Sequence, residues 1–386
     1  MKELELYLHI PFCERKCAYC DFLSAPADLP VRISYIKKLQ EEIAYYGSEF
    51  EEYQVSSIFL GGGTPTILEG YQLAAILETV KKYFRLVADA EITVECNPGT
   101  LTAGKAEKLV QAGFNRLSMG LQSADDRELQ LLGRIHNFAQ FLESYDLARK
   151  AGFENINVDL MSALPGQTLK SWQNTLQKVT ALRPEHISAY SLIIEEGTPF
   201  YERFAEDERI REEGGHPRLL PEEAIERQMY ELTKERLSDF GYHRYEISNY
   251  AKAGKECDHN KKYWKRFPYL GLGLGASSCM ENVRFSNERN FKTYGQKIKN
   301  GKLPVVEKEE LTKEDCMAEF MYLGLRMMEG VSKKMFYQNF LVPMETYYQS
   351  SLEKCIREGL IKENGDRYCL TDFGIDVSNR VFAEFI

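Results

Sequence analysis

Leu4-Glu-Leu-Tyr-Leu-His-Ile10, followed by Pro-Phe-Cys13-Glu-Arg-Lys-Cys17-Ala-Tyr-Cys20, is the stretch that decides the fold. Its short apolar first part predicts a β-strand. The cysteines come at once after that strand, in a hydrophilic loop, and residues 31–47 then have the periodicity of a helix. The chain therefore begins with a β/α unit whose connecting loop carries thiols.

The spacing of these thiols, C-x3-C-x2-C, lets one short loop turn three sulfur ligands onto one metal centre. A [4Fe–4S] cluster held by three cysteines leaves one iron open for an exchangeable ligand. A structural zinc is the alternative, and it needs a fourth ligand, for which His9 is near in sequence. Buried thiols without a metal are the third reading.

The same β/α pattern continues for six units. Further strands are predicted at 55–60, 91–94, 116–121, 155–160 and 186–194, with helices at about 68–84, 102–112, 137–151 and 168–181. Gly113 and Gly152 end two of these helices in nearly identical contexts. Consecutive β/α units require a parallel sheet, either doubly wound or a (β/α) barrel, with the active site at the C-terminal ends of its strands.

Polar residues gather at those predicted strand ends. The second strand runs into Gly61-Gly-Gly63-Thr64-Pro-Thr66, where glycines let the backbone approach a ligand. Later strands contribute Glu95, Gln122, Arg134 and Asp159. Each of these is compatible with a capping or solvated role. However, a carboxylate inside the apolar run Asn157-Val-Asp-Leu-Met requires a hydrogen-bond partner.

The rest of the chain divides by composition. We expect a barrel core at 1–240, a connecting segment at 241–304 that belongs to neither flank, and a C-terminal domain at 305–386 whose helix, strand, Asn364-Gly365-Asp366 turn, strand and helix resemble a winged helix. Wings often bind DNA, but this region has more acids than bases, so a structural or docking role is favoured over nucleic acid.

Charge and hydropathy exclude other classes of function. The chain has 49 Lys plus Arg and 58 Asp plus Glu, a net charge of −9, which argues against binding nucleic acid or an anionic membrane surface. The longest uncharged stretch, 53–68, is too short to cross a bilayer. The acidic N-terminus lacks the pattern of a secretory signal, so we expect a cytoplasmic protein whose nine cysteines are ligands or buried thiols.

Together these motifs resemble a known family. Cys13-x3-Cys17-x2-Cys20 with a Gly-Gly-Thr-Pro loop is similar to the radical S-adenosylmethionine enzymes, which are built on a partial (β/α)6 TIM-type barrel. Tyr7-Leu-His-Ile-Pro-Phe-Cys, Arg116-Leu-Ser-Met-Gly-Leu-Gln-Ser, Asp159-Leu-Met-Ser-Ala-Leu-Pro-Gly-Gln-Thr and Tyr190-Ser-Leu-Ile-Ile-Glu-Glu-Gly-Thr-Pro resemble the HemN/HemW group over essentially the whole chain.

That resemblance implies roles for individual residues. Cys13, Cys17 and Cys20 are expected to hold a [4Fe–4S] cluster. The residues expected to contact S-adenosylmethionine are Tyr7, Gly63, Thr64, Glu95, Gln122, Arg134 and Asp159. Whether S-adenosylmethionine is cleaved in function or only binds is left open.

The HemN/HemW group contains two kinds of protein, oxygen-independent coproporphyrinogen III oxidases, which are radical decarboxylases, and haem chaperones. The oxidases continue the cysteine motif as Cys-x2-Cys-x-Cys and carry a long N-terminal extension. Here Cys20 is followed by Asp21-Phe22, and the first cysteine is already residue 13. Both differences favour the chaperone, with the oxidase as the alternative.

The chaperone is also favoured by the motif His259-Asn-Lys-Lys-Tyr263-Trp264, which resembles the haem-binding signature of the chaperones. An imidazole can bind iron and two aromatic rings can lie against a macrocycle. Without the family, the same stretch reads as a solvated loop with a satisfied histidine. Cys257 is an alternative iron ligand or a spectator thiol. Basic residues around the motif are expected to meet the haem propionates: Lys252, Lys255, Lys261, Lys262, Lys265 and Arg266.

The chaperone reading implies partners as well. It implies haem as cargo and an acceptor protein, such as a membrane respiratory enzyme, and it allows a homodimer. Without further information the acceptor stays unidentified.

Overall fold

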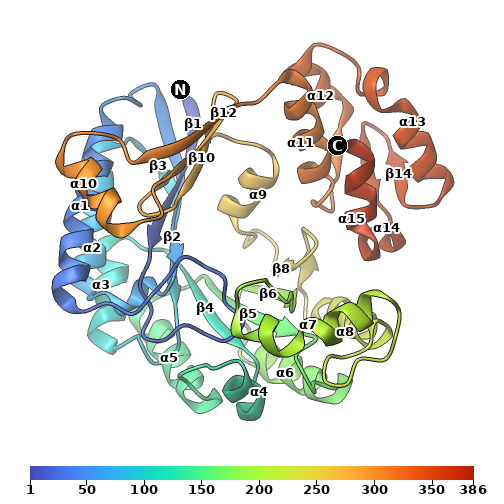
Figure 1. Ribbon diagram of the computed structural model, residues 1–386, viewed down its shortest axis with the longest axis horizontal. Helices are drawn as coiled ribbons and strands as arrows, with labels where there is room; N and C mark the ends of the chain where they lie inside the picture. Colours follow the sequence, from blue (N-terminus) through green and yellow to red (C-terminus); the bar gives the residue numbers. More distant parts are fainter.

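The computed structural model describes all 386 residues, and its centre is a curved, 12-stranded sheet (Figure 1). The first six strands are parallel and follow one another along the chain, as expected for a partial (β/α)6 barrel. They are β1 (Lys2–Ile10), β2 (Tyr53–Gly62), β3 (Leu86–Cys96), β4 (Arg116–Gln122), β5 (Ile156–Ser162) and β6 (His186–Ser191).

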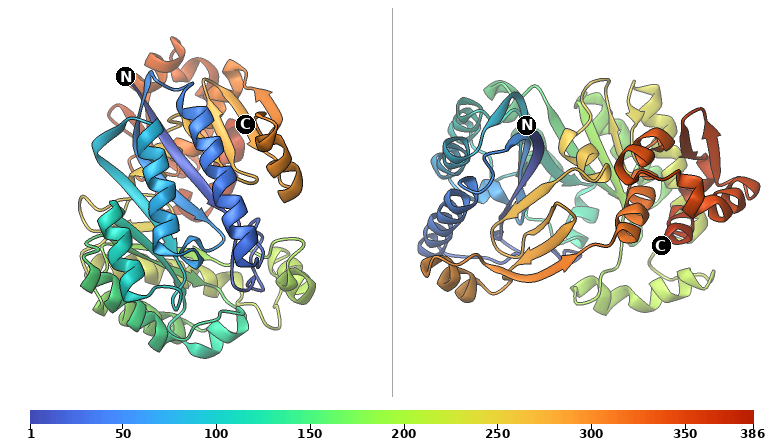
Figure 2. Two further views of the ribbon diagram at one scale, coloured as in Figure 1. Left: turned by 90° about the vertical axis from the view of Figure 1, so that its left-hand side faces the viewer. Right: turned by 90° about the horizontal axis from the view of Figure 1, so that it is seen from above.

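Helices cover the outer face of this sheet, as Figure 2 shows for the first of them. The covering helices are α1 (Leu29–Gly47), α2 (Gly70–Tyr83), α3 (Ala103–Ala112), α5 (Phe138–Ala151), α6 (Leu169–Ala181) and α8 (Glu223–Asp239). Two of them end as predicted, because Gly113 (φ 105°) and Gly152 (φ 104°) adopt the left-handed conformation that glycine tolerates best. Shorter elements interrupt the pattern: a 3₁₀ turn at Pro65–Ile67, α4 (Asp126–Leu131) and α7 (Pro199–Glu212).

Side chains alternate along the barrel strands. In β1, the apolar residues Leu4, Leu6 and Leu8 belong to a core of 54 buried residues. The alternate residues, Glu5 and Tyr7, have partners from the inner side of the barrel instead. Because side chains in a strand point to opposite faces in turn, the inner face of the barrel is polar and the outer face is apolar.

The segment 241–304 does not stand apart from its flanks, contrary to our expectation. It supplies strands to both edges of the main sheet, and β9 pairs in parallel with β1. Two of these short strands, β8 and β9, pair with β6 and β1 far away in sequence, and local composition carries no signal for such pairing. The elements are β7 (His243–Arg244), β8 (Asn249–Ala251), α9 (Asp258–Trp264), β9 (Tyr269–Leu272), β10 (Ser277–Met280), β11 (Val283–Asn287) and α10 (Phe291–Lys299).

The C-terminal part has a separate core of 18 buried residues around a three-stranded sheet. Residues 305–310 differ from the expected boundary, because β12 (Val305–Glu310) pairs with β11 in the main sheet. The predicted helix, strand, turn, strand and helix are present. The elements are α11 (Lys313–Gly324), β13 (Val331–Ser332), α12 (Lys333–Phe340), α13 (Met344–Arg357), β14 (Ile361–Asn364), β15 (Arg367–Leu370), α14 (Asp372–Asp376), α15 (Ser378–Phe382) and a 3₁₀ turn at Ala383–Phe385.

Helix α9 occupies a central place in this arrangement. It lies between the two edges of the curved sheet, and contacts β2 on its inner side (Figure 1). No helix combines the length and the apolar composition needed to cross a membrane.

Candidate functional site

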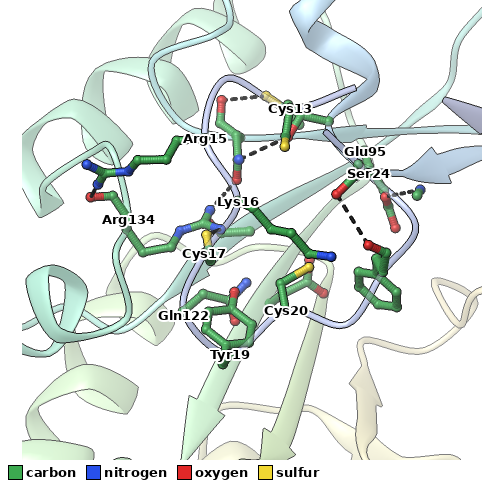
Figure 3. A pocket seen from close by; sticks show the side chains of 18 of the residues that line it. Cys13, Arg15, Lys16, Cys17, Tyr19, Cys20, Ser24, Glu95, Gln122 and Arg134 are labelled. Atoms are coloured by element: carbon green, nitrogen blue, oxygen red, sulfur yellow. Dashed lines mark hydrogen bonds between the residues drawn. The ribbon is translucent and has the colours of Figure 1, made fainter. Parts of the chain in front are cut away.

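The three cysteines of the first loop border one cavity at the C-terminal edge of the parallel strands (Figure 3). We call this cavity the cysteine pocket. It also includes most of the residues predicted for the cofactor: Gly63, Thr64, Glu95, Gln122, Arg134 and Asp159. The structure thus brings together residues from the β1 loop and the ends of β2, β3, β4 and β5, as the strand-end argument requires.

The thiols surround the cavity without converging on one point. All three are free, with Cys13 buried and Cys17 and Cys20 partly buried. No group of three or more His, Cys, Asp or Glu side chains is close enough to hold a single ion. A cubane cluster requires a different arrangement, because each thiolate binds a different iron around a common volume. Burial raises the pKa of Cys13 and Cys20, so both stay protonated until a metal displaces the proton.

His9 does not supply the fourth ligand of the zinc alternative. Its Nε2 lies 2.8 Å from the carbonyl oxygen of Leu23, and its Nδ1 lies 3.0 Å from the hydroxyl of Tyr7. Since Nε2–H donates to the carbonyl, Nδ1 accepts from Tyr7. Both ring nitrogens are therefore occupied in holding the end of the cysteine loop.

The glycines after β2 fix the backbone of the cysteine loop. A Cβ atom on Gly63 would collide with the backbone of Phe12, and Gly62 has φ 111°. The close approach allows Gly63 N–H to donate to Ile10 O at 2.9 Å and Thr64 N–H to donate to Phe12 O at 2.7 Å. Glycine is therefore needed here to pack two loops together, as well as to border the cavity.

Two carboxyl groups lie in the cysteine pocket without a salt bridge. Burial raises the pKa of Glu95 to about 8, and the nearby charge of Asp159 adds to the effect. Burial also raises the pKa of Asp159, although it accepts hydrogen bonds from Asn157 at 2.7 Å and Ser118 at 3.3 Å. Glu95 accepts one from Gly62 N–H at 3.0 Å. Half-buried carboxyls that lack a salt bridge suit a ligand that brings a positive group.

Arg134 and Gln122 form the opposite side of the pocket. Arg134 donates to Gly120 O at 2.6 Å and to Cys17 Sγ at 3.5 Å, and it also contacts Asn97. Its Nε is buried and has no hydrogen-bond partner. Gln122 has φ 74°, beside a register shift in β4. A non-glycine residue in this region costs on the order of 1–3 kcal/mol, a strain that is typical of functional sites.

Sequence reasoning missed several residues of the cysteine pocket, among them Asn97 and Ser118. Ser118 pairs with Glu95 in the sheet and lies two residues before Gly120 on the same face. Counting back from Gln122 in steps of two, through Gly120, would have found it.

The predicted haem motif lines a second, open cavity, which we call the α9 pocket. Its lining residues are Tyr7, Phe59, His259, Asn260, Tyr263 and Trp264, and its volume is about 180 Å³. Tyr7 lines this pocket, but it lies close enough to Glu95 of the cysteine pocket for that carboxyl to add to the rise in the pKa of Tyr7 that burial causes. The ring of His259 stacks on Phe59 with 5.3 Å between the ring centroids.

His259 is anchored through only one of its ring nitrogens. Nδ1 lies 2.6 Å from the hydroxyl oxygen of Ser57. Nε2 makes no hydrogen bond, and it is not among the buried polar atoms that lack a partner, so it keeps access to solvent. An imidazole in this state offers a free lone pair.

Trp264 connects the α9 pocket to the C-terminal domain. The guanidinium of Arg326 lies 4.3 Å from the centroid of its ring. Trp264 also borders a small cleft shared with Phe320 and Met327. The last residue of the motif is therefore as much an interdomain contact as a wall of the pocket.

We expected the basic residues around the motif to bind the haem propionates. In the structure most of them already form salt bridges with acids of this chain. Lys265 pairs with Glu329 at 2.6 Å, and Arg266 pairs with Glu319 at 2.7 Å. The remaining pairs are Lys252 with Glu185, Lys261 with Asp258, and Lys262 with Glu3 and Glu5. These acids come from distant segments, so the sequence around the motif could not reveal the pairing.

Cys257 lies outside the α9 pocket. It is fully buried, and its thiol donates to Glu91 Oε1 at 3.3 Å. Glu91 also accepts from the backbone N–H groups of Asp258 and His259, at 3.0 and 3.2 Å, and so caps the first turn of α9.

Comparison with known proteins agrees with this geometry. Residues 7–179 match the radical SAM superfamily, and residues 311–377 match the HemN C-terminal domain. The chain is 38% identical to "Heme chaperone HemW" of Bacillus subtilis (strain 168), over 98% of each chain. It is 32% identical to "Heme chaperone HemW" of Escherichia coli (strain K12), over 99% of this chain and 98% of that one.

The fold is also that of a solved enzyme. The structure of coproporphyrinogen III oxidase (HemN) from Escherichia coli superposes with a TM-score of 0.84. The superposition covers 100% of this chain and 90% of the other, at 24% sequence identity. This likeness confirms the radical SAM type of fold and does not extend to activity.

Proposed function

Because the chain belongs to the HemW family of haem chaperones within the radical SAM superfamily, we propose that it binds haem at the α9 pocket and passes it to an acceptor protein. The observation that carries this proposal is the state of His259. Its Nδ1 is anchored and its Nε2 is free, in an open pocket walled by aromatic rings. Neutral imidazole with a free nitrogen is a common ligand of haem iron.

The size of the pocket supports a carrier more than a storage site. Pockets that bury most of a ligand have volumes of roughly 300–1,000 Å³. The α9 pocket, at about 180 Å³, is smaller and open. Haem seated there would be covered on one side only, which leaves its remaining face and edge accessible to an acceptor.

We further propose that the cysteine pocket holds a [4Fe–4S] cluster on Cys13, Cys17 and Cys20, with S-adenosylmethionine on its open iron. The unpaired carboxyls of Glu95 and Asp159 would face the positive groups of that ligand, and the free Nε of Arg134 would face its carboxylate. Gly63, Thr64 and Gln122 complete the border of the cavity. A reduced cluster of this type supplies an electron to S-adenosylmethionine.

The alternative, coproporphyrinogen III oxidase activity, makes an opposite prediction. Anaerobic protein supplied with S-adenosylmethionine, a reductant and coproporphyrinogen III is expected to yield no protoporphyrinogen IX, while the same preparation binds haem. Catalytic formation of protoporphyrinogen would overturn the chaperone in favour of the oxidase.

A transfer assay tests the chaperone proposal directly. Haem-loaded protein is mixed with a haem-free b-type cytochrome at increasing concentrations, and the absorbance of the cytochrome is followed. Direct transfer predicts a rate that rises with acceptor concentration. A rate independent of the acceptor would mean that haem is first released into solution, and it would contradict a chaperone function toward this acceptor.

A further inference from the structure

We propose that Glu5 and Ser57 are positioning residues for haem: they hold His259 in the tautomer with its proton on Nδ1 and so direct the lone pair of Nε2 to the iron. This inference rests on the proposed haem site. Neither residue belongs to the H-N-x-x-Y-W motif, and neither is near it in sequence. They are side-by-side residues of β1 and β2, aligned in the sheet register.

The three groups form a buried chain. Glu5 is 1% exposed and Ser57 is fully buried. The Ser57 hydroxyl contacts Glu5 Oε2 and lies 2.6 Å from His259 Nδ1. The separation between His259 Nδ1 and Glu5 Oε2 is 3.5 Å, too long for a good direct hydrogen bond. Ser57 is therefore the link between the carboxylate and the imidazole.

The chemistry of the link fixes the position of the proton. A hydroxyl has one proton, and beside an ionised carboxylate that can only accept, it donates to the carboxylate. The hydroxyl oxygen then accepts from its other neighbour, so Nδ1 of His259 must carry a proton. A neutral imidazole protonated on Nδ1 has its lone pair on Nε2, the nitrogen that is free in the α9 pocket.

Glu5 is equipped to remain a carboxylate although it is buried. Its other oxygen, Oε1, accepts from the Ser56 hydroxyl at 2.7 Å and lies 3.3 Å from the ammonium group of Lys262. Lys262 is three residues after His259 on α9. A buried charge is tolerated when it is paired and hydrogen-bonded in this way. Lys262, inside the motif, thus stabilises the carboxylate of Glu5 and is not free to bind a haem propionate.

An imidazole whose one N–H group donates, through a hydroxyl, toward a carboxylate is a stronger ligand. Such outer partners orient the ring and raise its basicity, and their loss typically costs about 10–100-fold in metal affinity. We therefore expect Glu5→Gln and Ser57→Ala to weaken haem binding by about ten-fold or more. Both changes should also lower the iron–histidine stretching frequency of the ferrous protein in resonance Raman spectra, because the iron–nitrogen bond is weakened.

The control variant is Ser144→Ala, which removes a buried serine hydroxyl on α5 that bonds to Gln140 O and Gly99 N and contacts neither Glu5 nor His259. It should retain the wild-type Raman band and bind haem within about two-fold of wild type. Circular dichroism and iron content measured on every variant establish that the barrel and the cysteine pocket are intact. Glu5→Gln is nearly isosteric, so it decides the question if Ser57→Ala fails to fold.

The outcomes separate this inference from the proposed function. If His259→Ala loses the iron–histidine band while Glu5→Gln keeps the wild-type band and affinity, His259 is the ligand and the positioning role is wrong. If the wild-type protein binds no haem, or binds it with no histidine band, both the proposed haem site and the positioning role are overturned. A lowered band in Glu5→Gln with an unchanged band in Ser144→Ala supports the inference.

Discussion

The cysteine pocket and the α9 pocket lie in the same barrel but treat charge in opposite ways. In the cysteine pocket, Glu95 and Asp159 are half-buried without a salt bridge, and Arg134 retains a free Nε–H group. In the α9 pocket, charges are already matched: Glu5 pairs with Lys262, and most neighbouring bases have acids of their own. The first pocket is built for a polar, charged ligand, and the second presents aromatic rings and one imidazole.

The difference in charge between the two pockets is clearest in one glutamate of each, Glu95 and Glu5. Burial and the nearby charge of Asp159 raise the pKa of Glu95 to about 8, although Gly62 N–H donates to its carboxyl group. Glu5 has two serine hydroxyls and a lysine around it. The two pockets therefore differ in pairing: Glu5 has a salt bridge within the protein, and Glu95 has none.

The largest effect is expected at the cysteine pocket. Cys17→Ala should abolish the iron–sulfur chromophore, because two thiolates cannot retain a cubane that needs three. The measurement is iron and sulfide content after anaerobic reconstitution. Cys279→Ala, which changes a partly buried thiol outside both pockets, should retain both. Zinc without iron in the wild-type protein would refute the cluster.

A third buried carboxyl tests the link between burial and charge outside both pockets. Glu42 accepts hydrogen bonds from Tyr294 at 2.6 Å, Asn287 at 2.7 Å and Gly273 at 2.9 Å, but it has no cation. Burial raises its pKa to about 7 from an ordinary 4.5. The folded state therefore holds the proton more tightly than the unfolded state, and stability falls as the pH rises from 4.5 to 7.

Because the pKa rises from 4.5 to about 7, the free energy of unfolding should fall by about 3 kcal/mol across this range of pH. Thermal unfolding of Glu42→Gln, compared with wild type across that range of pH, should show a flatter dependence. Glu49→Gln, at an exposed site in the turn just after the same helix, should leave the wild-type slope unchanged. Parallel slopes for wild type and Glu42→Gln would show that Glu42 is ionised in the folded protein.

Glu95→Gln should weaken the binding of S-adenosylmethionine by about ten-fold, equivalent to about 1.4 kcal/mol. The physical reason is the loss of a carboxylate that a positively charged ligand would favour. Anaerobic calorimetry measures the change, and Glu107→Gln, on the exposed side of α3, is the matched control. Equal affinities in both variants would remove Glu95 from the site.

The smallest effect is expected at a base next to the haem motif. Lys265→Ala should change haem affinity by less than about two-fold, because its ammonium group is already paired with Glu329 and surface ion pairs contribute little. Lys255, which has no acidic partner in the structure, is the informative comparison. A ten-fold loss from Lys265→Ala would mean that the ion pair opens to meet a propionate.

The sequence predicts one pocket much better than the other. The strands β1–β6, the glycine stops at Gly113 and Gly152, and the assembly of the cysteine pocket all follow from local patterns and from the rule that parallel strands end at one edge. The α9 pocket depends on side chains of β1 and β2 that meet a helix about 200 residues later, as Ser57 meets His259. Only its motif was visible in the sequence, and the assignment of Tyr7 to S-adenosylmethionine rests on resemblance and stays a prediction.

The central claim is that one chain carries two separate sites, and the most direct test uses one preparation for both. Anaerobically reconstituted wild type, Cys17→Ala, His259→Ala and the exposed control His216→Ala are titrated with haem, and iron and sulfide are counted in the same samples. The prediction is that His259→Ala keeps the cluster and loses haem affinity or shifts the haem spectrum, while Cys17→Ala loses the cluster and still binds haem. Unchanged haem affinity and spectrum in His259→Ala would contradict the account.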